Sequence, residues 1–206
     1  AEKRGVQFLY ETNVGAGLPV INTLRDLINS GDHVHKIEGV LSGSLSYIFN
    51  NFNSSQEFYE IVKQAKSLGY TEPDPRDDLN GSDVMRKIII LARECGAQLE
   101  MEDIQIQYIL PESCRNAETV EDFFRELKLH KSYFAGLIEQ AEKEDKKLRF
   151  IARYENNGIK IQLESVGMDH PFYTLKGTEN MIIFTSDRYK ELPLVVRGPE
   201  AGARVT

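Results

Sequence analysis

The chain has 206 residues, 41% hydrophobic and 28% charged, a composition that excludes an intrinsically disordered protein. Its formal net charge is −7, from 25 Lys and Arg against 32 Asp and Glu, and it lacks the basic stripe that binds a phosphate backbone. The longest apolar run, residues 88–92, is far shorter than the roughly 20 residues of a membrane-spanning helix. We therefore expect neither a nucleic-acid partner nor a membrane.

The cysteines and the two chain ends indicate which cellular compartment to expect and whether the sequence is part of a longer protein. Cys95 and Cys114 show no C-x-x-C spacing, which predicts free thiols in a reducing compartment. The start shows no secretory signal, so we expect a cytoplasmic protein, or a plastid protein if the source is a plant. The chain begins close to a β-prone run and stops inside a Gly-rich turn, so we expect a part of a longer protein. A complete domain with trimmed tails is the alternative.

The first half of the sequence alternates between predicted strands and helices. The spacing of apolar residues, and the Gly and Ser residues between them, indicate where each element begins and ends. Pro19 suits a first helical turn, and residues 42–46 form a hydroxyl-rich helix cap. The expected elements are a strand over residues 6–10, a helix over 20–29, a strand over 36–41, a helix over 45–52, a helix over 58–68, a loop over 70–81 and a helix over 83–94.

The second half changes to helices followed by antiparallel strand candidates. The Asn157-Gly158 pair predicts a type I′ hairpin turn. Helices are expected over residues 120–127 and 132–144, and strands over 148–154, 159–166, 181–186 and 192–197. The sum predicts an α+β fold, a mixed sheet covered by helices.

Residues 69–87 carry the densest group of acidic side chains. Five carboxylates stand within twelve residues, at Glu72, Asp74, Asp77, Asp78 and Asp83. Carboxylates this close repel one another, so some of their pKa values should be raised unless cations or hydrogen-bond donors offset the repulsion. Raised pKa values are frequent at functional sites. The spacing does not match an EF-hand calcium loop.

Asp83 and Lys87 stand four residues apart on one helix face, which allows two interpretations. One is a surface ion pair worth a few tenths of a kcal/mol. The other is a lysine that exchanges a proton with a substrate, its pKa tuned by burial and by the carboxylate. Spacing alone favours the surface pair.

Other motifs carry weaker signals. The turn containing Gly15 and Gly17 resembles half of a dinucleotide fingerprint, but Val20 replaces the third glycine, so as a fingerprint it fails. Such a turn can hold a cation or merely connect two elements. His33 and His35 could bracket a metal, yet without a third nearby ligand a surface pair is favoured.

Three stretches, residues 10–19, 39–49 and 69–87, resemble successive signatures of the homoserine dehydrogenase family. The resemblance is strongest to the dehydrogenase part of bifunctional aspartokinase/homoserine dehydrogenases, and residues 192–206 are similar to the family's closing segment. It implies that residues 1–206 form the substrate-binding and dimerisation domain of a Rossmann-type dehydrogenase, without the NAD(P)-binding Rossmann domain. Such a fragment should be inactive alone.

The resemblance also implies a reaction and its residues. The family interconverts L-homoserine and L-aspartate 4-semialdehyde by hydride transfer with NAD(P), in threonine, methionine and isoleucine biosynthesis. The implied roles are Lys87 as the acid/base lysine, Asp83 as the carboxylate that holds the reacting hydroxyl, Glu72 and Asp78 as receivers of the substrate ammonium, and Gly43 and Ser44 as residues lining the pocket.

The family's cation and cofactor positions have counterparts as well. The backbone oxygens of Glu11, Val14, Ala16 and Leu18 resemble a monovalent-cation site for Na⁺ or K⁺, and Gly202 resembles a nucleotide contact. One departure is Glu200, an acid where the family's G-x-G-A-G motif has glycine, which argues against a close approach of the backbone to the cofactor. The resemblance further implies a homodimer and a possible fused aspartokinase.

Two other functions stay open. A binding module would recognise an amino acid or a cation without chemistry, and Lys87 would then point into solvent while the carboxylates converge. A dimerisation unit would pair edge strands around residues 181–197 across a two-fold axis.

Overall fold

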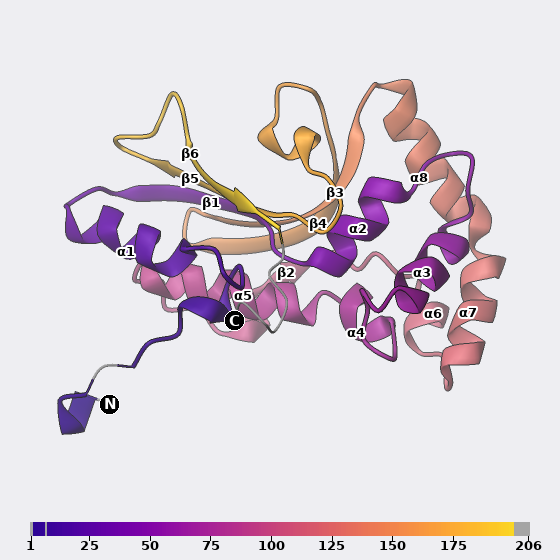
Figure 1. The fold of residues 1–206 in the computed structure, drawn as a ribbon, viewed down its shortest axis with the longest axis horizontal. Coiled ribbons are helices and arrows are strands. Elements are labelled where there is room, and N and C mark those ends of the chain that lie inside the picture. The colour runs from indigo at the N-terminus through magenta and orange to yellow at the C-terminus, as the bar shows by residue number, and fades with distance from the viewer. Residues whose placement is uncertain (1, 7, 200–206) are drawn as a thin grey trace.

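The strands of the chain form one mixed sheet in the order β2-β4-β3-β1-β5-β6 (Figure 1). This computed structural model describes residues 2–6 and 8–199. Neighbouring strands are antiparallel except β2 and β4, which are parallel. The strands are β1 (Val34–Val40), β2 (Gln105–Ile106), β3 (Lys147–Glu155), β4 (Gly158–Val166), β5 (Asn180–Ser186) and β6 (Leu194–Gly198). The predicted α+β fold with a mixed sheet is confirmed.

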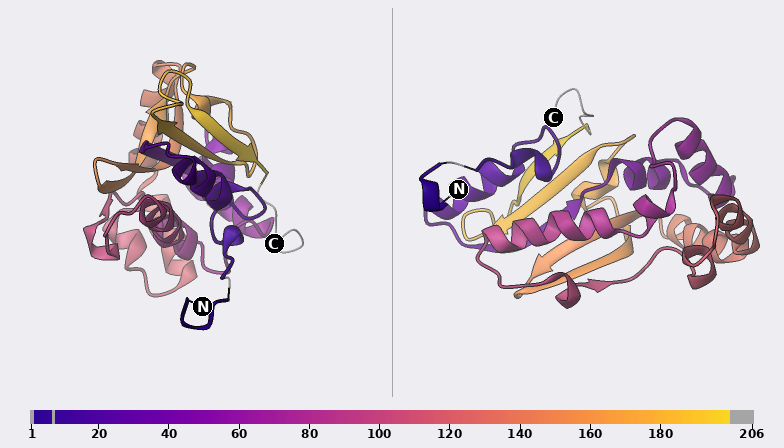
Figure 2. Two further views of the ribbon diagram at one scale, coloured as in Figure 1. Left: turned by 90° about the vertical axis from the view of Figure 1, so that its left-hand side faces the viewer. Right: turned by 90° about the horizontal axis from the view of Figure 1, so that it is seen from below.

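The helices cover one face of the sheet and extend beyond one end of it. α5 packs against β1, β3 and β4, with α1 beside it, and the remaining helices gather at one end (Figures 1 and 2). The helices are α1 (Val20–Asn29), α2 (Gly43–Asn51), α3 (Phe58–Ser67), α4 (Arg76–Leu79), α5 (Ser82–Glu94), α6 (Glu112–Arg115), α7 (Val120–Leu129) and α8 (Lys131–Lys143). No helix among the described residues is long and apolar enough to cross a membrane.

Alternation along β5 divides the core between the two faces of the sheet. Ile182 and Phe184 join the large cluster beneath the helices, whereas Met181 and Ile183 join a smaller cluster on the opposite face. Successive side chains of a strand point to opposite faces, so one buried strand serves both clusters. Burial of each large apolar side chain contributes roughly 1.5–3 kcal/mol. Phe172 is fully buried in the smaller cluster.

The hairpin between β3 and β4 has the predicted turn, shifted by one residue. Glu155 pairs with Gly158, so the two loop residues are Asn156 and Asn157, with φ of 51° and 56°. Positive φ at both central residues defines the type I′ turn, and Asn adopts this conformation more readily than most residues. The prediction that Asn157 and Gly158 would form its centre was wrong.

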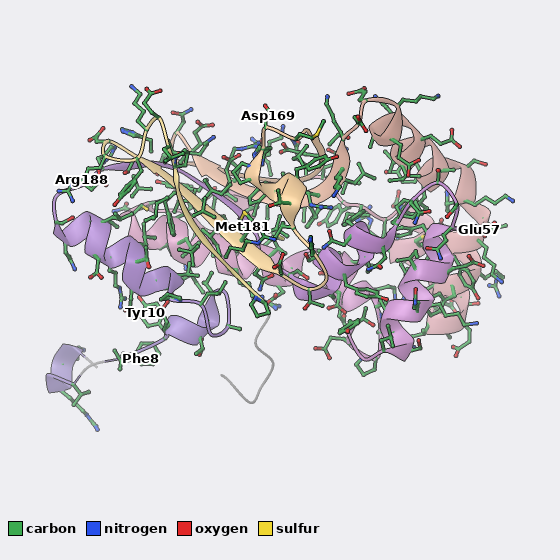
Figure 3. The ribbon with its side chains drawn as sticks, turned by 45° about the horizontal axis from the view of Figure 1, so that its top comes forward. Phe8, Tyr10, Glu57, Asp169, Met181 and Arg188 are labelled. Carbon is green, nitrogen blue, oxygen red and sulfur yellow. The ribbon has the colours of Figure 1, made fainter. Side chains whose placement is uncertain are left out.

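The strand predicted over residues 6–10 is also absent from the described part of that segment. Residues 6 and 8–10 pair with no strand, and Phe8 and Leu9 are 70% and 78% exposed. Figure 3 shows Phe8 on a segment leading away from the sheet. A β-prone run forms a strand only where a neighbour supplies hydrogen bonds and a packing surface, and the described residues supply neither here.

Local sequence sets the two helix starts that flank the site. Ser42 caps α2, because its Oγ accepts the backbone N–H of Leu45 at 3.3 Å, as predicted. Gly81, with φ of +74°, precedes α5, and a Cβ there would lie 3.1 Å from the ring of Phe150. Glycine therefore permits both the left-handed turn and the close approach to the sheet. The predicted loop over residues 70–81 contains the short helix α4, which the prediction missed.

Candidate active site

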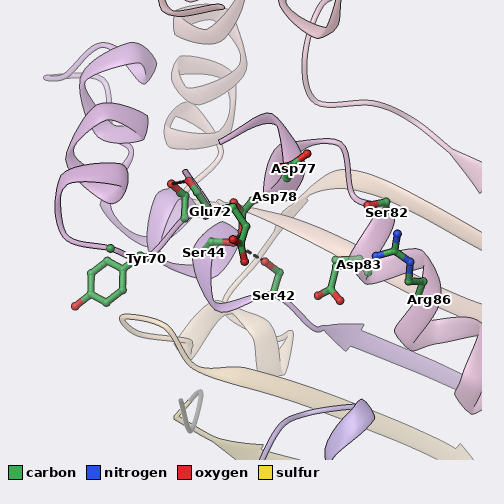
Figure 4. Close-up of a pocket in the computed structure, with 12 residues that line it drawn as sticks. Ser42, Ser44, Tyr70, Glu72, Asp77, Asp78, Ser82, Asp83 and Arg86 are labelled. Atoms are coloured by element: carbon green, nitrogen blue, oxygen red, sulfur yellow. Dashed lines mark hydrogen bonds between the residues drawn. The ribbon is translucent and has the colours of Figure 1, made fainter. Parts of the chain in front are cut away.

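A polar pocket of about 480 Å³ lies between the start of α2, the segment before and within α4, and the first turns of α5 (Figure 4). All of its lining residues except Ser42 and Ser44 come from residues 69–87, the segment that the sequence singled out for its acidic side chains. The pocket is lined by Ser42, Ser44, Gly69, Tyr70, Thr71, Glu72, Asp77, Asp78, Ser82, Asp83, Val84 and Arg86.

Asp78 forms the centre of a short hydrogen-bond chain. The Ser44 hydroxyl donates to Asp78 Oδ1 at 2.8 Å, and the backbone N–H of Glu72 donates to Asp78 Oδ2 at 2.8 Å. Burial raises the pKa of Asp78, these two bonds lower it, and the nearby Glu72 and Asp77 carboxylates raise it, so that the pKa is raised overall. No cation pairs with Asp78 in the described structure. The carboxylate is therefore poised to gain from a positively charged ligand.

Asp83 and Lys87 form the predicted ion pair at the edge of the pocket. Lys87 Nζ lies 2.6 Å from Asp83 Oδ2 and donates to the Leu41 carbonyl oxygen at 2.9 Å. The Lys87 side chain is 17% exposed and the Asp83 side chain 54%. An ammonium has three N–H donors, so two are engaged and one remains for a ligand. Lys87 therefore does not point into solvent.

Of the three remaining acidic side chains of the loop, one forms an ion pair with an arginine and two line the pocket. The guanidinium of Arg76 hydrogen-bonds both oxygens of Asp74 and holds the pKa of that carboxyl below its ordinary value. Glu72 and Asp77 instead line the pocket. The cation of Arg76 lowers the pKa of Asp74, as expected, whereas the raised pKa of Asp78 comes first from burial and only secondarily from the expected repulsion between carboxylates.

Not every predicted site residue reaches the pocket wall. Glu72, Asp78, Asp83 and Ser44 line it, whereas Gly43 and Lys87 do not. Gly43 is the buried first residue of α2, and Lys87 contacts the pocket through Asp83.

Eight of the twelve lining residues were not among the predicted site residues, and Ser42, Tyr70 and Arg86 illustrate why. Ser42 was read only as a cap, yet its Oγ also lies 2.9 Å from Ser44 Oγ. The rings of Tyr70 and Tyr47 lie 4.6 Å apart between centroids and are tilted by 40°, and Arg86 lies one residue before Lys87. Adjacency to the acidic residues was the only signal available for Tyr70 and Arg86.

The turn of residues 11–18 uses its one carboxylate to cap a helix. Glu11 accepts the backbone N–H groups of Ile21 at 2.7 Å and Asn22 at 2.8 Å, at the start of α1. The amides that would hold a dinucleotide phosphate at this helix end are therefore occupied. The turn does not fit a nucleotide, in agreement with the failed fingerprint.

Two backbone oxygens of the same turn keep a free lone pair. The Glu11 carbonyl accepts the N–H of Val14 at 3.4 Å, and the Leu18 carbonyl accepts that of Val20 at 2.9 Å. A carbonyl oxygen has two lone pairs, so each retains one. Because the Glu11 carboxylate points to α1, the donors left in the turn are neutral oxygens, which suit a hard monovalent cation better than a transition metal.

The histidines and cysteines form no further site in the described residues. His33 and His35 contact edge to face, and His35 Nε2 lies 2.7 Å from Asp187 Oδ1. No group of three metal-ligating side chains occurs within residues 2–6 and 8–199. Cys95 and Cys114 are free thiols, as predicted, and burial raises the pKa of each to about 11. Gly202 and Glu200 lie outside the described residues.

Comparison with known proteins identifies the family. The sequence profile of homoserine dehydrogenase matches residues 19–206. The chain belongs to the homoserine dehydrogenase family.

Homoserine dehydrogenases of two kinds are among the relatives. The chain is 46% identical over 201 residues to the bifunctional aspartokinase/homoserine dehydrogenase 2, chloroplastic, of Zea mays, a match that covers 97% of this chain and 22% of that protein. It is 44% identical over 214 residues to the homoserine dehydrogenase of Schizosaccharomyces pombe, covering 100% of this chain and 57% of the relative. The chain therefore spans only part of the relatives that it matches.

Solved structures share the fold. A Candida auris protein of unknown function matches with a TM-score of 0.90 at 41% identity, over 96% of this chain and 57% of that one. A hyperthermophilic archaeal homoserine dehydrogenase, in complex with NADPH, matches with a TM-score of 0.72 at 21% identity, over 100% of this chain and 54% of that one. The latter likeness shows the fold alone.

Two of the three family-like stretches meet at the pocket. Residues 39–49 supply the Ser42 cap and α2, and residues 69–87 supply α4 and the first turns of α5. The third, residues 10–19, forms the turn before α1. The homoserine dehydrogenase fold thus brings the acidic loop onto the start of α2, segments separated by more than twenty residues in the sequence.

Proposed function

We propose that this homoserine dehydrogenase domain is the substrate-binding half of an oxidoreductase that interconverts L-homoserine and L-aspartate 4-semialdehyde with NAD(P). The observation that carries the proposal is the position of the Asp83–Lys87 pair, at 2.6 Å, on the edge of a pocket lined by unpaired carboxylates. The pair supplies a proton donor, and the carboxylates supply a site for an amino-acid ammonium.

Glu72 and Asp78 bind the substrate ammonium in this proposal. Both side chains line the pocket, and Asp78 has no cationic partner among the described residues. An ammonium there makes charge-assisted hydrogen bonds and relieves the repulsion between neighbouring carboxylates. Ser44 orients Asp78 through its hydroxyl, which occupies one lone pair of Oδ1.

Lys87 and Asp83 handle the reacting oxygen. Bound NAD(P)H supplies the hydride that reduces the aldehyde carbon. The carbonyl oxygen then gains negative charge, and the free N–H of the Lys87 ammonium donates the proton that completes the hydroxyl. In the reverse direction, the substrate hydroxyl returns its proton to neutral Lys87. Asp83 accepts a hydrogen bond from the hydroxyl and holds the Lys87 side chain in place.

The nucleotide is held by other parts of the intact enzyme in this proposal. The α1 end that could receive a phosphate is capped by Glu11, and Gly202, the predicted contact, lies outside the described residues. The 206-residue chain alone should therefore lack activity. The backbone oxygens of Glu11, Val14, Ala16 and Leu18 hold Na⁺ or K⁺ in the turn, a role supported by their neutral donor set.

The proposed assembly is a homodimer, in some proteins fused to an aspartokinase. In residues 2–6 and 8–199 the sheet ends at β6, which pairs with β5 on one side, so its other edge is available to a second chain in this proposal. The maize relative is named as bifunctional and chloroplastic. We propose a plastid location for a plant source and a cytoplasmic one otherwise.

A non-catalytic amino-acid-binding module is the second candidate. It requires converging carboxylates with Lys87 in solvent. The carboxylates do converge, but Lys87 is engaged by the Leu41 carbonyl and by Asp83. This favours proton transfer over binding alone.

The test is homoserine-dependent formation of NAD(P)H by the intact protein, measured beside this chain. We expect activity only in the intact protein. Lys87→Ala should lower kcat by about 10³-fold, the contribution of a positioned acid or base, while KM for homoserine changes little. Arg125→Ala, which breaks an exposed ion pair on α7, is the matched control. Near-normal turnover in Lys87→Ala would refute the assignment.

A further inference from the structure

A second pocket lies on the far side of α4 from the site described above. It has a volume of about 510 Å³. Asp77 and Ser82 line both pockets, so α4 and the start of α5 form the wall between them. We propose that this second pocket binds a small organic carboxylate through Arg115, the last residue of α6.

The guanidinium of Arg115 is positioned without an internal anion. Its Cζ lies 4.2 Å from the centre of the Tyr108 ring, which holds the group in place by a cation–π contact. Its Nε is buried and has no hydrogen-bond partner. Within residues 2–6 and 8–199, the side chain makes no ion pair. The buried Nε is closed to a ligand, but the two terminal nitrogens also make no hydrogen bond within the described residues and remain accessible, so they are the donors that an anionic ligand can use.

The other arginine of this pocket shows the contrast. Arg76 binds both oxygens of Asp74 through its fork and also donates to the Ala117 carbonyl. Its charge is therefore neutralised inside the protein. Arg115 has the same planar fork but no carboxylate partner among the described residues, so the carboxylate of the ligand pairs with Arg115 as that of Asp74 pairs with Arg76.

The lining selects a monoanion with an apolar body. Met85, Leu110 and Tyr108 provide an apolar surface beside the guanidinium. Asp77 adds a negative charge to the same pocket, which disfavours the double charge of phosphate. A planar carboxylate on an aliphatic or aromatic skeleton matches one free guanidinium and this surface.

The proposal does not depend on the reaction proposed above. Arg115, Tyr108 and Leu110 line the second pocket and not the first, whereas Lys87 lines neither pocket and contacts the first through Asp83. Failure of homoserine oxidation would leave carboxylate binding intact, and the reverse holds as well.

The experiment measures binding of benzoate and of benzamide, its uncharged isostere, to the intact protein by calorimetry and NMR. We expect benzoate to bind with a Kd on the order of 1 mM and benzamide at least about tenfold more weakly. Arg115→Met keeps the apolar stem and should weaken benzoate binding at least about tenfold. Arg125→Met, on the exposed face of α7, and Lys87→Ala should each leave the Kd within about twofold.

Three results would overturn the proposal. Equal affinity for benzoate and benzamide would exclude charge recognition, and loss of benzoate binding in Lys87→Ala would place the carboxylate in the first pocket. Tighter binding of inorganic phosphate than of benzoate would contradict the monoanion. If Arg115→Met does not fold, the ratio of the benzoate and benzamide affinities of the wild-type protein tests the proposal instead. NMR shifts on adding benzoate should then appear at Tyr108 of the second pocket rather than at Tyr70 of the first.

Discussion

Two regions of the molecule hold carboxylates with opposite pKa shifts, the buried Glu38 and the half-buried Asp78. On the sheet face opposite α5, Glu38 is buried and receives Lys36 at 2.8 Å and Arg153 at 2.9 Å. Burial raises the pKa of Glu38, but hydrogen bonds from Lys36 and Arg153 outweigh it, so the pKa is lowered overall. In the pocket, burial dominates and the pKa of Asp78 is raised.

The difference lies in where the compensating charge comes from. Arg153 also pairs with Glu164 at 2.9 Å, so these side chains form a network on the sheet. The cations of this sheet network, Lys36 and Arg153, belong to the protein itself. Within the described part of the chain, Asp78 has only neutral donors, the Ser44 hydroxyl and the Glu72 amide. A carboxylate neutralised internally contributes to stability, whereas one left without a cation contributes to ligand binding at a cost in stability.

Removing the cation of the sheet network should give the largest effect of this comparison. Arg153→Met leaves Glu38 and Glu164 without their shared partner, and we expect the free energy of unfolding to fall by about 3 kcal/mol. Denaturant unfolding of the intact protein measures it. A second change, Glu38→Gln, should recover part of the loss. A fall below about 0.5 kcal/mol would show that Lys36 alone suffices.

Removing the charge of the pocket should change binding rather than stability. Asp78→Asn should raise KM for homoserine about 30-fold, because one charge-assisted contact to the ammonium is lost. The free energy of unfolding should change by less than about 1 kcal/mol, since a lost hydrogen bond is offset by removal of a desolvated charge. Steady-state kinetics beside denaturant unfolding tests both. An unchanged KM would remove Asp78 from the ammonium site.

The two carboxylates should also give opposite pH dependences of stability. The pKa of Asp78 is raised from 3.8, so its favourable contribution is complete below about pH 4 and is lost as pH rises through the raised value. The pKa of Glu38 is lowered from 4.5, so its contribution is present above about pH 4.5 and is lost as pH falls through the lowered value.

Unfolding free energies of wild type, Asp78→Asn and Glu38→Gln from pH 3 to 7 measure these slopes. Relative to Asp78→Asn, wild type should lose stability as pH rises; relative to Glu38→Gln, it should gain. KM for homoserine should rise as pH falls through the raised pKa of Asp78, because its charged form binds the ammonium. Parallel slopes for the two variants would contradict the comparison.

The smallest effect is expected at Asp74, four residues from Asp78. Asp74→Asn should lower the free energy of unfolding by about 1 kcal/mol, because it weakens a partly exposed bidentate pair with Arg76. KM for homoserine should stay within about twofold of wild type, since Asp74 does not line the first pocket. A large rise in KM would show that the loop geometry, rather than the charge of Asp78, controls binding.

The predicted helices and strands agree closely with the structure where a periodic apolar pattern is bounded by residues such as Gly or Pro. α1 was predicted over residues 20–29 and is found there, and Gly31, which ends the pattern, has a φ of 80°. The strand over residues 6–10 failed because strand formation depends on a neighbour that no local pattern reveals. Helix α4 was missed because four residues give too little periodicity to recognise.

The sequence by itself determined the acidic stretch, the spacing of Asp83 and Lys87, the Ser42 cap and the family-like order of these segments. Only the tertiary structure decided which carboxylates stay without a cation. Asp74 and Asp78 lie in the same loop, yet Arg76 reaches one and Ser44, from another element, reaches the other. The pKa of a carboxyl depends on burial and on groups within a few ångströms, and folding, not sequence distance, brings those groups together.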